Sequence, residues 1–172
     1  MLIRRETPAD VDAIRAVHVA AFAPTTEGDA EPVEAGLVDA LRASTEWLPS
    51  LSLVATDDGE VIGHVVCTRA WVAGRPALGL GPLGVLPGHQ AKGAGSALMH
   101  AVLGAADALG EPLVALLGHT GYYPRFGFRP GTELGVRAPD PAWGAHFQVR
   151  PLGAYDPTLR GEFRYAKPFR DL

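Results

Sequence analysis

The sequence predicts a mixed α/β fold in a single domain that spans residues 1–172. Two apolar spacings alternate along the chain: recurrence about every three or four residues, typical of one helix face, and short β-branched runs, typical of strands. A glycine-rich loop also lies between an apolar run and a long helical pattern. A chain of 172 residues with 47% hydrophobic residues is long enough for one packed core.

The charge balance excludes a general nucleic-acid binder. The chain has 15 Lys and Arg against 19 Asp and Glu, a formal net charge of −4. Any site for an anion must therefore be local.

Cysteine usage and hydropathy predict a cytoplasmic protein. Cys67 is the only cysteine and cannot form an intrachain disulfide, so we expect a reducing compartment and a structural role for this thiol. The N-terminus becomes charged at once, unlike a signal peptide, and no apolar stretch approaches the ~20 residues of a membrane span. We expect no membrane partner.

The N-terminal part predicts a strand followed by two helices. Residues 2–5 form the strand. A helix over 8–22 begins after Thr7 as N-cap, with Pro8 at its first position. A second helix follows, because apolar residues recur every four positions at Val33, Leu37 and Leu41.

The middle of the chain predicts a hairpin and an irregular fourth strand. β-Branched runs over 51–56 and 60–68 flank an Asp58-Gly59 turn. Residues 77–86 predict the fourth strand, although they include three glycines and Pro82, which are poor strand formers. We expect a bulge there or the close approach of another group.

A β-loop-α-β unit covers residues 78–117. A helix over 95–109, ended by Gly110, precedes a buried strand over 112–118. The apolar stripe of this helix consists of Leu98, Val102, Ala105 and Leu109. Short strands near 134–137 and 147–150 are expected in the tail.

The loop of this unit has the composition of an anion site. In "HQAKGAGSALM", Gly93 and Gly95 allow main-chain N–H groups to turn inward, and the helix start adds partial positive charge. No Asp or Glu occurs between Glu60 and Asp107. Buried strands lack carboxylates in any case, and glycine turns before helices are common, so composition alone leaves both interpretations open.

Two familiar phosphate loops do not match. A Walker A loop needs Lys and Ser or Thr where this chain has Ala94 and Gly95. A dinucleotide fingerprint needs a third glycine where it has Leu98. A nucleotide-phosphate enzyme is therefore disfavoured.

The segment Gln90-Ala91-Lys92-Gly93-Ala94-Gly95, five residues after Leu83-Gly84-Val85, resembles the Q/R-x-x-G-x-G/A motif of GNAT-superfamily N-acetyltransferases. The segment Gly121-Tyr122-Tyr123-Pro124-Arg125-Phe126-Gly127-Phe128 resembles the second signature of that family, with a Tyr four residues before Gly-Phe. The order of elements is similar over about residues 1–130. With "GHV" in the third strand and the final "RYAKPF", the chain is most like a small bacterial branch of predicted acetyltransferases.

The resemblance implies the acyl-CoA N-acyltransferase fold over residues 1–172: a twisted, mixed but mostly antiparallel sheet of about seven strands flanked by about four helices. It implies acetyl-CoA as cosubstrate and no metal. The diphosphate would bind N–H groups from Gln90 to Ser96, and the pantetheine arm would run along the fourth strand. The cofactor-binding residues implied are Leu83, Gly84, Val85, Gln90, Ala91, Lys92, Gly93, Ala94, Gly95, Ser96 and Tyr123.

The resemblance also implies how acetyl transfer would proceed. The N–H of Val85 would polarise the thioester carbonyl, and Tyr123 would be the general acid for the thiolate. Tyr123 alternatively packs in an aromatic corner. Lys92 would add a positive charge beside the diphosphate.

The general base is open at this stage, because the fourth strand carries no Glu. His64, His119 and, behind them, Glu34 are the candidates, and for each histidine a structural role is favoured over a catalytic one. His18, His89, His100 and His146 lack ligand-like spacing, so we expect no metal site.

The expected reaction is acetylation of a small-molecule primary amine. A peptide or protein acceptor is the alternative within this class, and a non-catalytic acyl-CoA sensor is the alternative outside it. The acidic run Glu27, Asp29, Glu31 and Glu34 suits a cationic acceptor or is simply solvated. The apolar tail over 131–172 would cover the acceptor cleft or pair with a second subunit in a homodimer.

Overall fold

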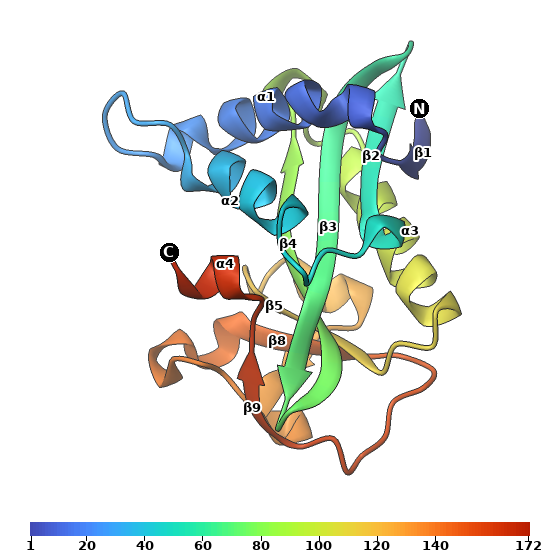
Figure 1. The fold of residues 1–172 in the computed structure, drawn as a ribbon, viewed down its shortest axis with the longest axis vertical. Helices are drawn as coiled ribbons and strands as arrows, with labels where there is room; N and C mark the ends of the chain where they lie inside the picture. Colours follow the sequence, from blue (N-terminus) through green and yellow to red (C-terminus); the bar gives the residue numbers. More distant parts are fainter.

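A computed structural model describes residues 1–172 as a twisted nine-stranded sheet with helices on both faces (Figure 1). The strands are β1 (Leu2–Arg5), β2 (Ser52–Asp57), β3 (Glu60–Val72), β4 (Arg75–Val85), β5 (Leu113–Leu117), β6 (Arg129–Pro130), β7 (Val136–Arg137), β8 (Phe147–Pro151) and β9 (Gly161–Arg164). The α-helices are α1 (Val11–Phe22), α2 (Val33–Arg42), α3 (Ala94–Ala108) and α4 (Lys167–Arg170).

The predicted fold class is confirmed. The sheet order is β1-β2-β3-β4-β5-β8-β6, and β9 pairs with β3 and β7. All pairs are antiparallel except β4 with β5 and β7 with β9. The sheet has nine strands instead of the expected seven, and two of the nine, β6 and β7, contain only two residues each.

The first helix begins as predicted, through a capping arrangement centred on Asp10. A 3-10 turn over Pro8–Asp10 leads directly into α1. The Asp10 carboxylate accepts hydrogen bonds from the Thr7 N–H and hydroxyl and pairs with Arg4 at 2.7 Å. These charge-assisted bonds hold the pKa of Asp10 low, at about 2.

Alternate residues of the strands face opposite helices. Leu53 and Ala55 of β2 pack in the cluster that contains α3, whereas Val54 packs with Ile14 and Val17 of α1. This alternation is the two-residue period of an extended chain. The α1–α2 pair and α3 therefore cover opposite faces of the sheet (Figure 1).

Two residues of the predicted helix stripes are exposed instead of buried. Val33 is 62% exposed at the first position of α2, and Leu109 is 55% exposed just beyond α3. Both lie at helix ends, where the sheet no longer covers the helix.

β4 leaves its parallel neighbour after a short contact. It pairs with β5 only at Leu78 and Gly79. Its register with β3 shifts between Val65 and Cys67, opposite Gly81 and Pro82, which confirms the expected irregularity in this strand. Beyond this point the edge of β4 that faces β5 has no strand partner.

The tail folds back onto the central sheet. β8 pairs along the whole of β5, β9 pairs with β3 at Trp71 and Val72, and α4 packs near α2. The short strands predicted near 134–137 and 147–150 correspond to β7 and β8. The tail completes a second buried cluster around Phe147, Phe163 and Tyr165.

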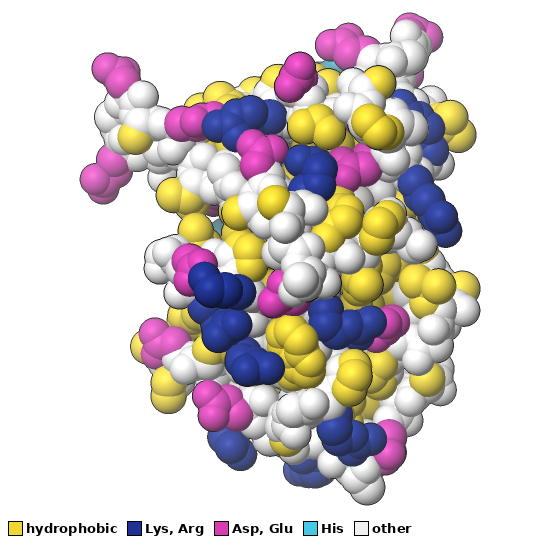
Figure 2. All heavy atoms as spheres, in the orientation of Figure 1, with side chains coloured by type: hydrophobic (Ala, Val, Ile, Leu, Met, Phe, Trp, Pro, Cys, Tyr) yellow, Lys and Arg dark blue, Asp and Glu magenta, His cyan; other side chains and the backbone are white.

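The surface has mixed charge. Lys and Arg side chains are interspersed with Asp and Glu over the face in Figure 2. None of the helices is both long and apolar enough to cross a membrane. Cys67 is fully buried, and burial raises the pKa of its thiol, which agrees with a structural role.

Leu98 is the position in α3 where truncation should be most costly, because it is fully buried in the main core cluster. Leu98→Ala should lower the free energy of unfolding by about 2–5 kcal/mol through lost burial and a new cavity. Leu109→Ala, at an exposed leucine just beyond the same helix, should change it by less than about 0.5 kcal/mol. Urea denaturation of both variants tests this, and equal effects would contradict the packing described.

Candidate functional site

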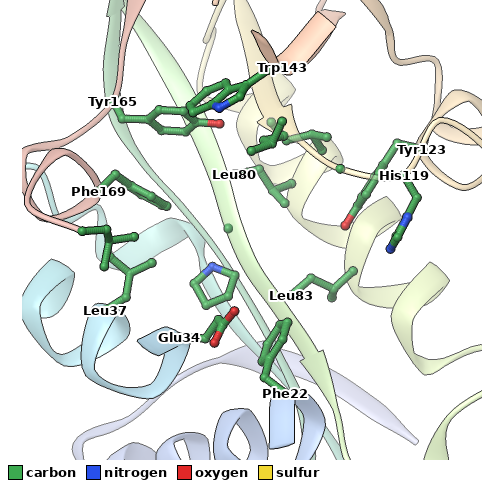
Figure 3. A pocket seen from close by; sticks show the side chains of 16 residues that line it. Phe22, Glu34, Leu37, Leu80, Leu83, His119, Tyr123, Trp143, Tyr165 and Phe169 are labelled. Carbon is green, nitrogen blue, oxygen red and sulfur yellow. The ribbon is translucent and has the colours of Figure 1, made fainter. Parts of the chain in front are cut away.

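Two adjoining cavities lie beside the free edge of β4. The loop cavity, of about 440 Å³, is lined by Leu83, Val85, Gln90, Ala91, Gly93, Gly95, Ser96, Tyr122 and Arg125. The central cavity, of about 520 Å³, lies among β4, β5, α2 and the tail (Figure 3). Leu83 lines both, so the two cavities meet at this residue.

The loop before α3 presents main-chain donors. Gly93 caps the helix with φ of 92°, and Ala91 has φ of 58°, both in the left-handed region. The first helical hydrogen bond runs from the N–H of Ala97 to the carbonyl of Gly93. The N–H groups before Ala97 therefore have no partner within the helix and carry its positive end. Such a turn can bind an anion such as a diphosphate.

Gln90 and Gly95 shape this loop in different ways. The Gln90 amide donates to the carbonyl of Val85 at 3.0 Å, which ties the loop to the end of β4. A side chain at Gly95 would lie 3.2 Å from the Tyr122 hydroxyl. Gly95 therefore leaves room for the Tyr122 hydroxyl, whereas Gly93 provides the left-handed turn.

The cation that lines the loop cavity is Arg125, which sequence analysis did not single out. Its guanidinium lies 4.7 Å from the Tyr122 ring centroid and donates to the carbonyls of Gly121 and Tyr122. Lys92 does not line this cavity; its ammonium group donates to the carbonyl of Gly88 at the surface. Ala94 and Gly84 do not line it either. The sequence could have pointed to Arg125, because this residue lies inside the segment Gly121–Phe128 that resembles the second family signature.

The free edge of β4 directs two N–H groups away from β3. The N–H of Leu86 donates to the carbonyl of Ile62 at 2.8 Å. Because bonding residues alternate in an antiparallel ladder, Gly84 also bonds to β3, and the N–H groups of Leu83 and Val85 point to the opposite side. β5 has already diverged there, so these donors face the cavities.

Tyr123 lies on the wall of the central cavity. It begins the short 3-10 helix Tyr123–Phe126, and its hydroxyl points into the cavity beside His119 (Figure 3). A side chain at Gly118 would overlap the Tyr123 ring, so this glycine is needed for the ring position. Burial, and next the neighbouring Tyr122, raise the pKa of Tyr123 to about 12, which keeps its proton in place at neutral pH.

The opposite walls come from the N-terminal helices and the tail. Phe22 and Glu34 lie at one end, and Trp143, Tyr165 and Phe169 lie at the other (Figure 3). A side chain at Gly79 would lie 2.9 Å from the Tyr165 ring, so β4 makes room for it. The sequence predicts a tail that covers a cleft or pairs with a subunit, and in the structure the tail lines the central cavity.

His64 is not in either cavity. It is fully buried on β3, and its two ring nitrogens are occupied by His18 and by the Ser52 hydroxyl, each at 2.8 Å. His18 is also fully buried, and its Nδ1 has no hydrogen-bond partner. His119 and Glu34 are therefore the two candidate bases that line the central cavity.

The acidic segment before α2 is mostly on the surface. Glu31 pairs with Arg15 at 2.6 Å, while Glu27 and Asp29 are exposed. Only Glu34 of this set lines the central cavity. No group of three or more His, Cys, Asp or Glu side chains is arranged to hold a metal ion.

Comparison with known proteins identifies relatives over almost the whole chain. The model of the acetyltransferase (GNAT) family matches residues 19–128. The uncharacterized N-acetyltransferase YjhQ of Escherichia coli (strain K12) is 34% identical over 168 residues, which are 93% of this chain and 89% of that protein.

Two solved structures of GNAT proteins are similar in both sequence and fold. A GNAT family acetyltransferase from Brucella melitensis in complex with acetyl-CoA is 36% identical, with a TM-score of 0.79 over 98% of this chain and 97% of that one. YhbS of Escherichia coli in complex with CoA is 33% identical, with a TM-score of 0.86 over 98% of this chain and 91% of that one.

The buried His18–His64 pair predicts a loss of stability in acid. Burial, and next the Arg42 charge, lower the pKa of His18 to about 4, and burial lowers the pKa of His64 well below its usual value. An unfolded histidine has a pKa of about 6.5. The unfolded chain thus binds more protons between about pH 6.5 and pH 4, so the free energy of unfolding should fall as the pH drops through this window.

His18→Gln should make the free energy of unfolding less dependent on pH in this window. His100→Gln, at an exposed histidine, should leave that dependence unchanged. Melting temperatures from about pH 7 to about pH 4.5 measure the slopes. The assignment is wrong if His18→Gln and the wild type lose stability in parallel.

Proposed function

Because the chain belongs to the GNAT family of acetyltransferases, we propose that it transfers the acetyl group of acetyl-CoA to the primary amine of a small molecule. The observation that carries the proposal is the junction of the two cavities at Leu83. An anion-binding loop with free N–H groups leads there into a cavity that holds Tyr123 and Glu34. The similar proteins from Brucella and Escherichia coli were crystallised with acetyl-CoA and CoA.

The loop cavity would hold the diphosphate of the cosubstrate. The N–H groups from Ala91 to Ser96 would bind it, whereas that of Gln90, which was also expected to, donates to the carbonyl of Pro87 at 3.4 Å. Arg125 would supply the positive charge expected from Lys92. The pantetheine arm would occupy the unpaired edge of β4 and approach Leu83. The N–H of Leu83 lies at the junction and would polarise the thioester carbonyl, while that of Val85, which sequence analysis favoured, lies nearer the loop.

Acetyl transfer would then need two proton-handling groups. His119 accepts a proton from the ammonium, and the freed nitrogen lone pair forms the C–N bond with the thioester carbon. Tyr123 donates its proton to the sulfur as the C–S bond breaks, and the remaining excess proton on nitrogen returns to the Tyr123 oxygen. The proposal is supported by the position of His119 and Tyr123 side by side on the cavity wall, from which both would act on one reacting centre (Figure 3).

A non-catalytic acyl-CoA sensor is the less favoured alternative. A binding module needs the loop cavity but not a Tyr hydroxyl and a His side by side on the wall of the adjoining central cavity. A cytoplasmic location is part of the proposal and is supported by the single, buried thiol of Cys67. The homodimer remains a prediction.

Tyr123→Phe tests the general acid. The change removes the proton donor but keeps the ring, so kcat should fall roughly 100-fold or more while the Kd for acetyl-CoA changes little. Tyr155→Phe, at a partly buried Tyr outside both cavities, is the matched control and should leave kcat unchanged. Steady-state kinetics and calorimetric titration measure both, and an unchanged kcat in Tyr123→Phe would rule out this role.

Gly93→Ala tests the loop. A Cβ meets no atom at Gly93 or at Gly110, but both have positive φ, of 92° and 75°, so alanine strains each turn similarly. Only the turn at Gly93 orients the diphosphate donors, so Gly93→Ala should weaken acetyl-CoA binding about tenfold or more. Gly110→Ala should bind like the wild type. Equal affinities in all three proteins would contradict the assignment.

A further inference from the structure

We infer, on the basis of the proposed function, that the acceptor is an amine with a single cationic head and an aromatic or bulky apolar body. Glu34 binds the ammonium, and the aromatic wall of Trp143, Tyr165 and Phe169 binds the body. The inference rests on the charge, the lining and the size of the central cavity.

Glu34 is the only side chain with a full negative or positive charge among the sixteen that line the cavity, apart from the titratable His119. It is half-buried in the first turn of α2 and makes no ion pair or side-chain hydrogen bond within the chain. Its acidic neighbour Glu31 is paired with Arg15, so of these two acids only Glu34 is unpaired, and it is the one that lines the cavity. A partly desolvated carboxylate beside apolar walls favours a cation as its partner.

The wall across the cavity from Glu34 is aromatic (Figure 3). The ring centroids of Trp143 and Tyr165 are 6.2 Å apart, and those of Tyr165 and Phe169 are 4.7 Å apart. Phe22 adds another ring beside Glu34. Ring faces in this arrangement accept an aromatic or branched apolar group by stacking and edge contacts.

The cavity is large enough for such a body beside the acetyl group. Its volume is about 520 Å³, whereas a cavity of about 150 Å³ holds one benzene molecule. Eleven of its sixteen lining residues are hydrophobic. The remaining space thus suits a ring on a short alkyl linker, with its nitrogen held by Glu34 on the side of Leu83 and Tyr123.

The same lining disfavours polar acceptors. A second ammonium group would have no second carboxylate side chain to pair with, and peptide groups would find few side-chain donors or acceptors. Burying polar groups without partners is costly. Polyamines and peptides are therefore expected to be poor acceptors.

The test is the kcat/KM of wild-type protein, with saturating acetyl-CoA, for 2-phenylethylamine, putrescine, ethanolamine and an alanine-led hexapeptide. Phenylethylamine should be preferred by about tenfold or more over each of the others. Glu34→Gln should raise its KM about tenfold or more and leave the Kd of acetyl-CoA unchanged. Glu27→Gln, at an exposed acid of the same segment, should change neither.

Binding provides a readout that does not depend on turnover. Calorimetric titration of phenylethylamine into the wild type with bound CoA should show saturation, and Glu34→Gln and Trp143→Ala should each weaken it. Acetylation that prefers putrescine, ethanolamine or the peptide would overturn the inference while leaving acetyl transfer intact. Binding of acetyl-CoA without binding or acetylation of phenylethylamine would also overturn it, whereas failure to bind any CoA species would overturn the proposed function itself.

Discussion

The separation of β4 from β5 is the constraint on which the rest of the site depends. Two parallel strands that paired along their length would satisfy each other's main-chain groups, but here the pairing ends at Gly79 and Ala115. The N–H groups of Leu83 and Val85 are left facing a cavity. Main-chain groups in a partly enclosed site need partners, so the fold itself creates a place for an extended ligand with hydrogen-bonding groups.

Glycines leave the space that several side chains of the site and its surroundings occupy. Gly118 admits the Tyr123 ring and Gly79 admits Tyr165. Gly84 admits His18, because a Cβ there would lie 2.7 Å from its Nδ1. The buried chain from His18 through His64 to Ser52 then holds α1 against β3 and β2. His64 thereby supports β3, the neighbour of β4, and does not reach the central cavity.

Local patterns predicted most of the fold and the glycine-rich loop before α3, but not the lining of the central cavity. The strand at 2–5, the helix at 8–22, the hairpin at Asp58-Gly59 and α3 follow from short-range spacing and caps. β9 and α4 do not, because they depend on contacts with β3 and α2 far along the chain. For the same reason Trp143 and Phe169 could not be assigned to a cavity, and Glu34 could not be told from the paired Glu31.

The central claim is that main-chain amides at the start of α3 and along β4 hold acetyl-CoA. Titration of ¹⁵N-labelled protein with acetyl-CoA, followed by amide chemical shifts, tests it most directly. The account predicts that the largest shifts fall on Gln90–Ser96 and on Leu83 and Val85, with small shifts on β1 and β9. Saturable binding whose shifts leave these amides unchanged, or no binding at all, would contradict it.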